Sequence, residues 1–289
     1  MRLLILGDLH GQKPRFRFKD FDAVITPGDF CYPNDLRKYQ FRFIREKLKN
    51  PEIKYKWYDI VGKKKTRALI KKSLFKGRMV LESLDSVGVP VFIVPGNWDF
   101  TQERDSKWNF LKKGHFKNLI SGLKNVKNTH MKISNFKDYA IVGYGISSGP
   151  EVPQHKEDMK NVEKKVLEKK LKKSKKEYEQ KYQRVSKLFG KAKKPIIFLS
   201  HNVPFNTKLD KITTKSSPRY GYHYGSLITR DIIEKYQPLI SIAGHMHENL
   251  GKTKIGKTVC INSGFGSKVN VLLELEGKTI KKIKFHNGK

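Results

Sequence analysis

Five short apolar runs in this chain each lead into Asp, Asn or His, in most cases beside Gly, and this repetition constrains the fold most. The runs cover residues 2–6, 22–26, 90–94, 195–199 and 238–242. Continuous apolar runs of this length are typical of strands buried on both faces. Segments with helical periodicity, such as 226–236, lie between the runs. Strands that alternate with helices predict an α/β architecture, in which ligands bind beyond the carboxyl ends of the strands.

Further strands are predicted at residues 138–143, 258–262 and 269–274, and around 280–285 after a turn at Glu276-Gly277. The length of 289 residues suits one domain, and we expect a single domain over 1–289. Two stretches are expected to be insertions in it, at approximately 34–78 and 155–194.

The net charge is +34, and only 37% of the residues are hydrophobic. No apolar run approaches the roughly 18 residues that span a bilayer, so no membrane span is predicted. The first apolar run is too short for a signal peptide, and we interpret it as a strand. Two cysteines cannot form a disulfide framework, which favours a reducing, cytoplasmic setting. The charge permits binding to nucleic acid, but heat adaptation also enriches surface lysine.

The charge is concentrated in the two insertions. Residues 36–58 interleave Lys and Arg with six aromatic residues, a composition that suits single-stranded nucleic acid. The alternative is a helix with a solvated basic face and a buried aromatic face, which we favour. Residues 156–194 predict a long or bent charged helix that packs one stripe on the body. Contact of this helix with a membrane surface or nucleic acid is the less favoured interpretation.

Seven side chains at the predicted strand ends are chemically suited to bind metal. They are Asp8, His10, Asp29, Asn97, His201, His245 and His247. This mixed nitrogen and oxygen set suits Mn, Fe, Zn, Co or Ni better than Mg or Ca. Seven ligands are too many for one ion, whereas two ions with a bridging ligand can bind a phosphate between them.

Taken in order, Asp8-x-His10, Gly28-Asp29, Gly96-Asn97-x-Asp99, His201 and Gly244-His245-x-His247 resemble the signature of the calcineurin-like metallophosphoesterase family. The resemblance implies a four-layer α/β sandwich of two mixed sheets flanked by helices, with basic helical insertions. It implies two divalent metal ions, with Mn favoured. Asp8, His10, Asp29 and His247 would hold the first ion, and Asn97, His201 and His245 would complete the second. Asp29 would bridge them, and a bridging hydroxide would attack phosphorus.

Trp98 departs from the family pattern, which usually has His after the Asn. Indole cannot donate a titrating proton, so we expect activity that is slow, restricted to good leaving groups, or served by another acid. His223 is the candidate, and Ser226 is the expected N-cap of a helix whose free N–H groups favour phosphate. The alternative is an aromatic loop that merely covers the site. His115, His130, His155 and His286 match no motif and are expected at the surface.

We therefore expect a phosphate-ester hydrolase in which Asp29, Asn97 and His223 act in catalysis, and more specifically a phosphodiesterase. One alternative is a nuclease of the same family. The other is a catalytically weak scaffold, because of Trp98. The oligomeric state is left open.

Overall fold

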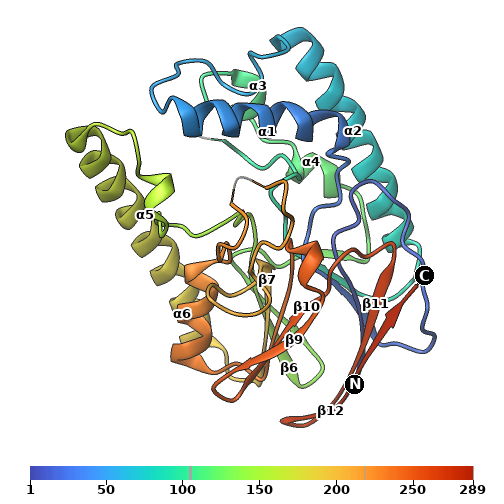
Figure 1. The fold of residues 1–289 in the computed structure, drawn as a ribbon. Helices are drawn as coiled ribbons and strands as arrows, with labels where there is room; N and C mark the ends of the chain where they lie inside the picture. Colours follow the sequence, from blue (N-terminus) through green and yellow to red (C-terminus); the bar gives the residue numbers. More distant parts are fainter. Residues whose placement is uncertain (104–105, 218, 289) are drawn as a thin grey trace.

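The computed structural model describes residues 1–103, 106–217 and 219–288, and its centre is a pair of six-stranded sheets (Figure 1). The first contains, in spatial order, β12 (Thr279–Asn287), β11 (Val269–Glu276), β1 (Arg2–Leu6), β2 (Ala23–Thr26), β3 (Val91–Ile93) and β4 (Val126–Asn128). The second contains β5 (Ile133–Phe136), β6 (Tyr139–Tyr144), β7 (Ile196–Asn202), β8 (Ile240–Gly244), β10 (Thr258–Asn262) and β9 (Gly251–Ile255). Both sheets are mixed, since parallel strands at the centre adjoin antiparallel pairs.

Alternation along the strands divides the core into layers. In β1, Leu3 and Ile5 belong to the cluster that joins the two sheets, whereas Leu4 and Leu6 belong to the cluster beneath the helices. Successive side chains of a strand point to opposite faces, so a strand buried on both faces must be apolar throughout. This explains why the runs that form β1, β2 and β3 are continuous rather than alternating.

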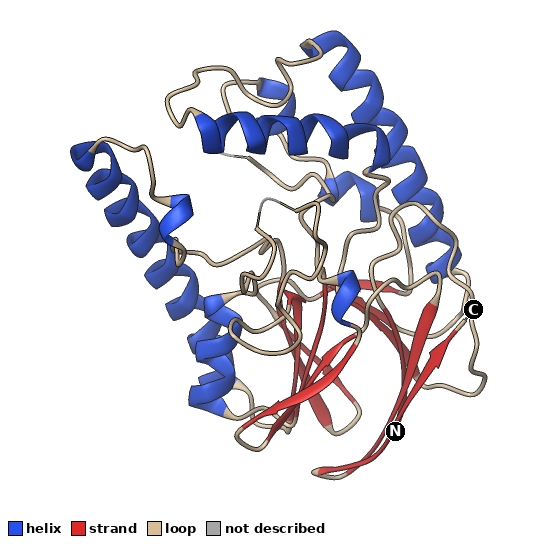
Figure 2. Cartoon of the chain, viewed as in Figure 1, coloured by secondary structure: helices blue, strands red, loops and turns tan. Residues whose placement is uncertain are grey.

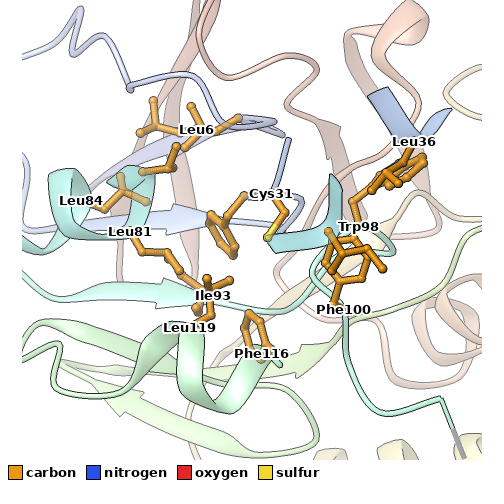
Figure 3. Close-up of a cluster of buried hydrophobic side chains, with 14 of the residues drawn as sticks. Leu6, Cys31, Leu36, Leu81, Leu84, Ile93, Trp98, Phe100, Phe116 and Leu119 are labelled. Atoms are coloured by element: carbon orange, nitrogen blue, oxygen red, sulfur yellow. The ribbon is translucent and has the colours of Figure 1, made fainter. Parts of the chain in front are cut away.

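Helices cover the outer face of each sheet (Figure 2). On the first sheet lie α2 (Lys63–Asp85), α3 (Asn109–Lys112) and α4 (Phe116–Ile120), and α1 (Asn34–Lys49) packs against α2 above the strands (Figure 1). The second sheet carries α5 (Lys164–Lys191) and α6 (Leu227–Tyr236). Short 3₁₀ turns lie at Lys156–Asp158 and His247–Asn249. Figure 3 shows part of the cluster under the first group, where Cys31, Leu81 and Trp98 are buried. The expected fold class, two mixed sheets flanked by helices, is confirmed.

The two predicted insertions differ in how they join this body. The boundary expected near residue 78 falls inside α2, whose Ile70, Val80, Leu81 and Leu84 pack into the cluster of the first sheet. By contrast, α5 buries only Val185 and Phe189, both in its C-terminal half. Its N-terminal half projects from the body (Figure 1).

The aromatic residues of 36–58 do not form the buried face that we favoured. Tyr58 is buried and Trp57 packs against the first cluster, but Tyr39 and Phe43 are only half-buried, and Phe41 and Tyr55 are 49% and 40% exposed. Lys38 lies over the ring of Tyr39, and Lys47 lies over the ring of Phe43. This surface therefore keeps aromatic rings and positive charge together at the solvent.

No helix in the described part of the chain is both long and apolar enough to cross a membrane. Cys31 and Cys260 are both buried and free.

Candidate metal centre

The seven predicted ligands follow the carboxyl ends of five strands. Asp8 and His10 follow β1, Asp29 follows β2 and Asn97 follows β3. His201 lies near the end of β7, and His245 and His247 follow β8. Within each sheet these strands are parallel, so their carboxyl ends lie at the same edge. The pairing of β7 with β8 is irregular between Leu199 and Asn202, which places His201 at a break in the ladder.

Asp8, His10 and His247 form the first of two clusters. Their ligand atoms lie within 4.8 Å of one another. His247 Nε2 is 2.8 Å from Asp8 Oδ2 and 3.3 Å from His10 Nε2. The backbone N–H of His245 also donates to Asp8 Oδ2, at 2.9 Å. Three donor atoms from opposite ends of the sequence thus face a common point.

Asp29, His201 and His245 form the second cluster, within the same 4.8 Å limit. His201 Nδ1 is 2.8 Å from the carbonyl oxygen of Pro27, which can only accept, so Nδ1 carries the proton. In a neutral imidazole, the lone pair is then at Nε2, which is 2.9 Å from Asn97 Oδ1. His201 Nε2 and Asn97 Oδ1 are then both acceptors and cannot hydrogen-bond to each other. Their close approach fits a cation that both atoms coordinate.

Asp29 lies between the two clusters. Its Oδ2 is 3.9 Å from His10 Nε2 and 3.7 Å from His201 Nε2. Its Oδ1 accepts a hydrogen bond of 2.8 Å from the backbone N–H of Trp98. The carboxylate is therefore held by one oxygen, and the other faces a histidine of each cluster.

Close packing of backbone around these carboxylates explains the glycines of the motifs. A Cβ on Gly96 would lie 2.0 Å from Asp29 Oδ1, and a Cβ on Gly244 would lie 2.3 Å from Asp8 Oδ1. Three ligand residues, His10, Asp29 and His245, have φ between 46° and 65°, in the left-handed region. Such conformations are costly for residues other than Gly and persist where the surrounding structure holds them, often at functional sites.

Asp99 joins two of the ligand loops, a role that the sequence motif contains but does not explain. Its Oδ2 accepts the N–H groups of Asp29 and Gly96, both at 2.8 Å. Its Oδ1 accepts those of Phe30 and Cys31, at 2.8 and 3.1 Å. The side chain is fully buried. One carboxylate thus fixes the loop of Asp29 relative to the loop of Asn97.

Burial sets the protonation of the histidines. It lowers the pKa of His10 to about 3 and that of His245 to about 3, so both are neutral near pH 7, the form that binds metal. Burial raises the pKa of Asp29, and the nearby carboxylates of Asp8 and Asp99 raise it further. For Asp8, burial acts in the same direction, but the hydrogen bond and charge of His247 outweigh it and lower the pKa. Such crowding of carboxylates is relieved by bound cations.

The donor set fits divalent metal. Asp8 Oδ1 is buried and has no hydrogen-bond partner within the described ranges. Buried polar atoms are otherwise almost always paired, so an unpaired carboxylate oxygen beside imidazoles fits the coordination of a divalent cation. Carboxylate, amide and imidazole together are the ligands of Mn, Fe, Zn, Co or Ni.

His223 and Ser226 belong to a different group of contacts. His223 Nδ1 donates to Asp210 Oδ1 at 2.7 Å, and Asp210 is fully buried. Ser226 caps α6 as expected, accepting from the N–H of Thr229 at 3.1 Å. However, the Ser226 hydroxyl donates to Glu151, and that carboxylate also accepts the N–H groups of Leu227 and Ile228. The helix N-terminus expected to bind phosphate already holds an anion from the chain itself.

The four histidines outside the motifs are all partly buried, contrary to our expectation of surface positions. His115 Nε2 lies 3.0 Å from the carbonyl oxygen of Phe110, and the ring of His155 stacks on Tyr222. His130 Nδ1 accepts the N–H of Gly145 at 2.8 Å. Trp98 is only 6% exposed and packs in the cluster of Figure 3.

The fold and the site together define a metal-dependent hydrolase. The model of the calcineurin-like phosphoesterase family matches residues 1–249. The chain therefore belongs to this family of metal-dependent hydrolases, and the predicted resemblance is confirmed. A search of the curated proteins finds no match.

Solved structures are similar to this chain at low identity, and one with a TM-score above 0.5 shares its fold. One crystal structure covers 100% of this chain and 99% of its own, with a TM-score of 0.63 and 15% identity. TT1561 of Thermus thermophilus covers 99% of this chain and 98% of its own (TM-score 0.48, 14% identity). A 5'-nucleotidase, described as putative, from Staphylococcus aureus covers 99% of this chain and 54% of its own (TM-score 0.49, 12% identity).

Proposed function

We propose that this chain is a phosphodiesterase with a binuclear metal site. The observation that carries the proposal is the position of Asp29, whose Oδ2 faces a histidine of each ligand cluster. A single-ion site needs no carboxylate between two sets of imidazoles. Two ions that share a carboxylate are the arrangement suited to binding and hydrolysing a phosphate ester.

We assign Asp8, His10, Asp29 and His247 to one ion and Asn97, His201 and His245, with Asp29 shared, to the other. When bound, the two ions supply a hydroxide nucleophile near neutral pH and stabilise charge on the phosphate oxygens. We favour Mn, which this mixture of imidazole, carboxylate and amide accepts. Asp29 and Asn97 then act in catalysis by orienting the metal pair, and Asp99 positions both of their loops.

His223 is our proposed general acid. Asp210 accepts the Nδ1–H of His223, so Nε2 is the nitrogen left to exchange a proton with substrate. Asp210 also accepts the N–H groups of Asn206, Thr207 and Gly225, which fixes the carboxylate in place. The His223 side chain is 31% exposed, so a proton can reach it from solvent. We leave Ser226 out of the proposed substrate site, because its hydroxyl is buried against Glu151.

A phosphodiester is favoured over a monoester by the missing motif histidine and by the open surroundings of the site. A cleft of about 1480 Å³ is lined by Pro95, two residues before Asn97, and by Lys181, Arg184 and Lys187 of α5, but by none of the seven predicted ligands themselves. These cations favour a second candidate within the same class, a nuclease acting on single strands. We also propose a cytoplasmic location, in keeping with two free cysteines.

The test is a paired measurement of metal content and hydrolysis. We expect two metal ions per chain and Mn-dependent cleavage of bis-p-nitrophenyl phosphate faster than that of p-nitrophenyl phosphate. Asp29→Asn weakens a shared ligand and should abolish turnover. Two ions without turnover of either ester would contradict the enzyme and favour a binding protein.

His223→Ala tests the acid separately. Because p-nitrophenolate leaves without protonation, we expect the variant to retain most activity on the aryl ester. An alkyl leaving group needs the proton, so its cleavage should fall by about 10²–10⁴-fold. Equal effects on both esters would contradict the acid role.

A further inference from the structure

The start of α1 places one arginine beside the metal centre. Leu36, in the first turn, is buried in the same cluster as Trp98 and Phe100 (Figure 3). Arg37 follows Leu36, and its guanidinium lies over the Trp98 ring, 5.9 Å from the ring centroid. Trp98, which stands where the family usually has histidine, thus forms a cation–π contact with Arg37.

The charge of Arg37 acts on the metal ligands. The carboxylates of Asp29 and Asp8 lie close enough to raise the pKa of Arg37, although burial has the larger effect and lowers it. In return, the positive charge of Arg37 is among the causes that lower the pKa of His10. The Arg37 charge is therefore close enough to interact electrostatically with the carboxylates of Asp29 and Asp8, one from each cluster.

Arg37 has no carboxylate partner among the described residues, although five other arginines do. Arg2, Arg42, Arg78, Arg219 and Arg230 each form an ion pair with Asp or Glu. Arg37 is partly buried, yet its guanidinium forms no hydrogen bond or ion pair with any residue that the structure describes. A partly desolvated guanidinium with free N–H groups beside a metal site is suited to an anionic ligand. Its planar fork matches two oxygens of a phosphate group.

We propose that Arg37 binds the non-bridging oxygens of the phosphate group at the metal centre. This inference rests on the proposed function and identifies the residue that holds the substrate's reacting group. The positive charge that the family usually supplies from the motif histidine then comes from a helix of the basic segment, held in place by Trp98. Trp98 is accordingly a positioning residue rather than a disabling change.

The experiment uses the metal-loaded, full-length protein and inorganic phosphate as the probe. Isothermal titration gives the Kd for phosphate, and metal analysis gives the number of ions per chain. Arg37→Ala should keep both ions but raise the Kd by about 10- to 100-fold, because a charge-assisted bidentate contact is lost. Arg37→Lys keeps the charge without the fork and should recover part of the affinity.

Arg45→Ala is the matched control, since Arg45 is on the same helix and is exposed. It removes the same charge and should leave the Kd unchanged. A Kd for Arg37→Ala equal to that of the wild type, with both ions present, would overturn the proposal. So would an equal loss in Arg45→Ala, which would indicate a long-range effect of charge.

Hydrolysis is measured in the same samples, so that the two ideas fail separately. Arg37-dependent phosphate binding without ester cleavage would support this inference and contradict the proposed phosphodiesterase. Normal cleavage in Arg37→Ala, with an unchanged Kd, would overturn this inference alone.

Discussion

At the scale of single residues, Asp99 makes the sharpest prediction. Asp99→Asn replaces one carboxylate oxygen by an NH₂ group that must face backbone N–H donors of Asp29, Phe30 or their neighbours. Leaving such buried groups unpaired costs about 1–3 kcal/mol each. We expect the free energy of unfolding to fall by roughly 2–4 kcal/mol and the metal affinity to fall about 10- to 100-fold.

Urea unfolding and metal titration check both parts of the Asp99 prediction. Asp20→Asn is the control, because Asp20 is exposed and has positive φ, which Asn tolerates. A wild-type metal affinity in Asp99→Asn would contradict the role given to Asp99.

Residue types and spacing sufficed to find the residues that gather at the site. Asp8, His10 and Asp29 each follow an apolar run, and parallel strands bring such ends to one edge of a sheet. What spacing could not provide was the partner of each ligand. That Asp210 orients His223, or that Glu151 covers the start of α6, depends on loop conformations without periodicity.

At the scale of elements, the pKa of His130 depends on the packing of α5 against the second sheet. Burial, and then the positive charges of Arg184 and Lys181 on α5, lower the pKa of His130 to about 4. An unfolded histidine has a pKa of about 6.5, so between these values the unfolded chain binds a proton that the folded chain does not. Stability should therefore fall as the pH drops from about 6.5 to about 4, by up to about 3 kcal/mol from this residue.

The measurement is urea unfolding of metal-free protein at pH 7 and at pH 4.5. His130→Gln keeps an acceptor for the N–H of Gly145 but cannot titrate. His10 and His245 add acid sensitivity of their own, so the informative quantity is the difference between wild type and variant. An unchanged loss of stability on acidification in His130→Gln would show that His130 is not held neutral by its surroundings.

The central strands, α6 and the edge strand β12 were predicted, whereas the long helix α2 and the edge strands β4, β5 and β9 were missed. β4, β5 and β9 lie at or beside solvent and have few apolar residues, so no run of hydrophobic side chains marks them. α1 shows the opposite difficulty. Its mixture of aromatic and basic residues suggested a buried face, but α1 packs against another helix, α2, and Phe41 stays 49% exposed.

At the scale of the whole molecule, we infer one domain from how the ends of the chain meet. β1 pairs with β11 over five residues, and Leu275 N–H donates to the carbonyl oxygen of Met1. The cluster between the sheets includes Leu3 from the first strand and Leu273 from β11. Residues from both ends thus share one core, and the metal ligands follow strands that contribute to it.

The net charge of +34 makes a prediction about the natural substrate. If the charge binds nucleic acid, the affinity for a single-stranded oligonucleotide should fall steeply with salt, by about 300-fold between 50 and 200 mM for six phosphate contacts. The exposed rings of Phe41 and Tyr55 should add stacking on the bases.

Fluorescence anisotropy checks the salt dependence and the stacking, with about 5- to 100-fold weaker binding expected for Phe41→Ala. Phe75→Ala, on the outer face of α2 and 67% exposed, is the control. Binding that does not change with salt, or equal losses in both variants, would remove nucleic acid as the partner, and the proposed diesterase would then act on a small ester.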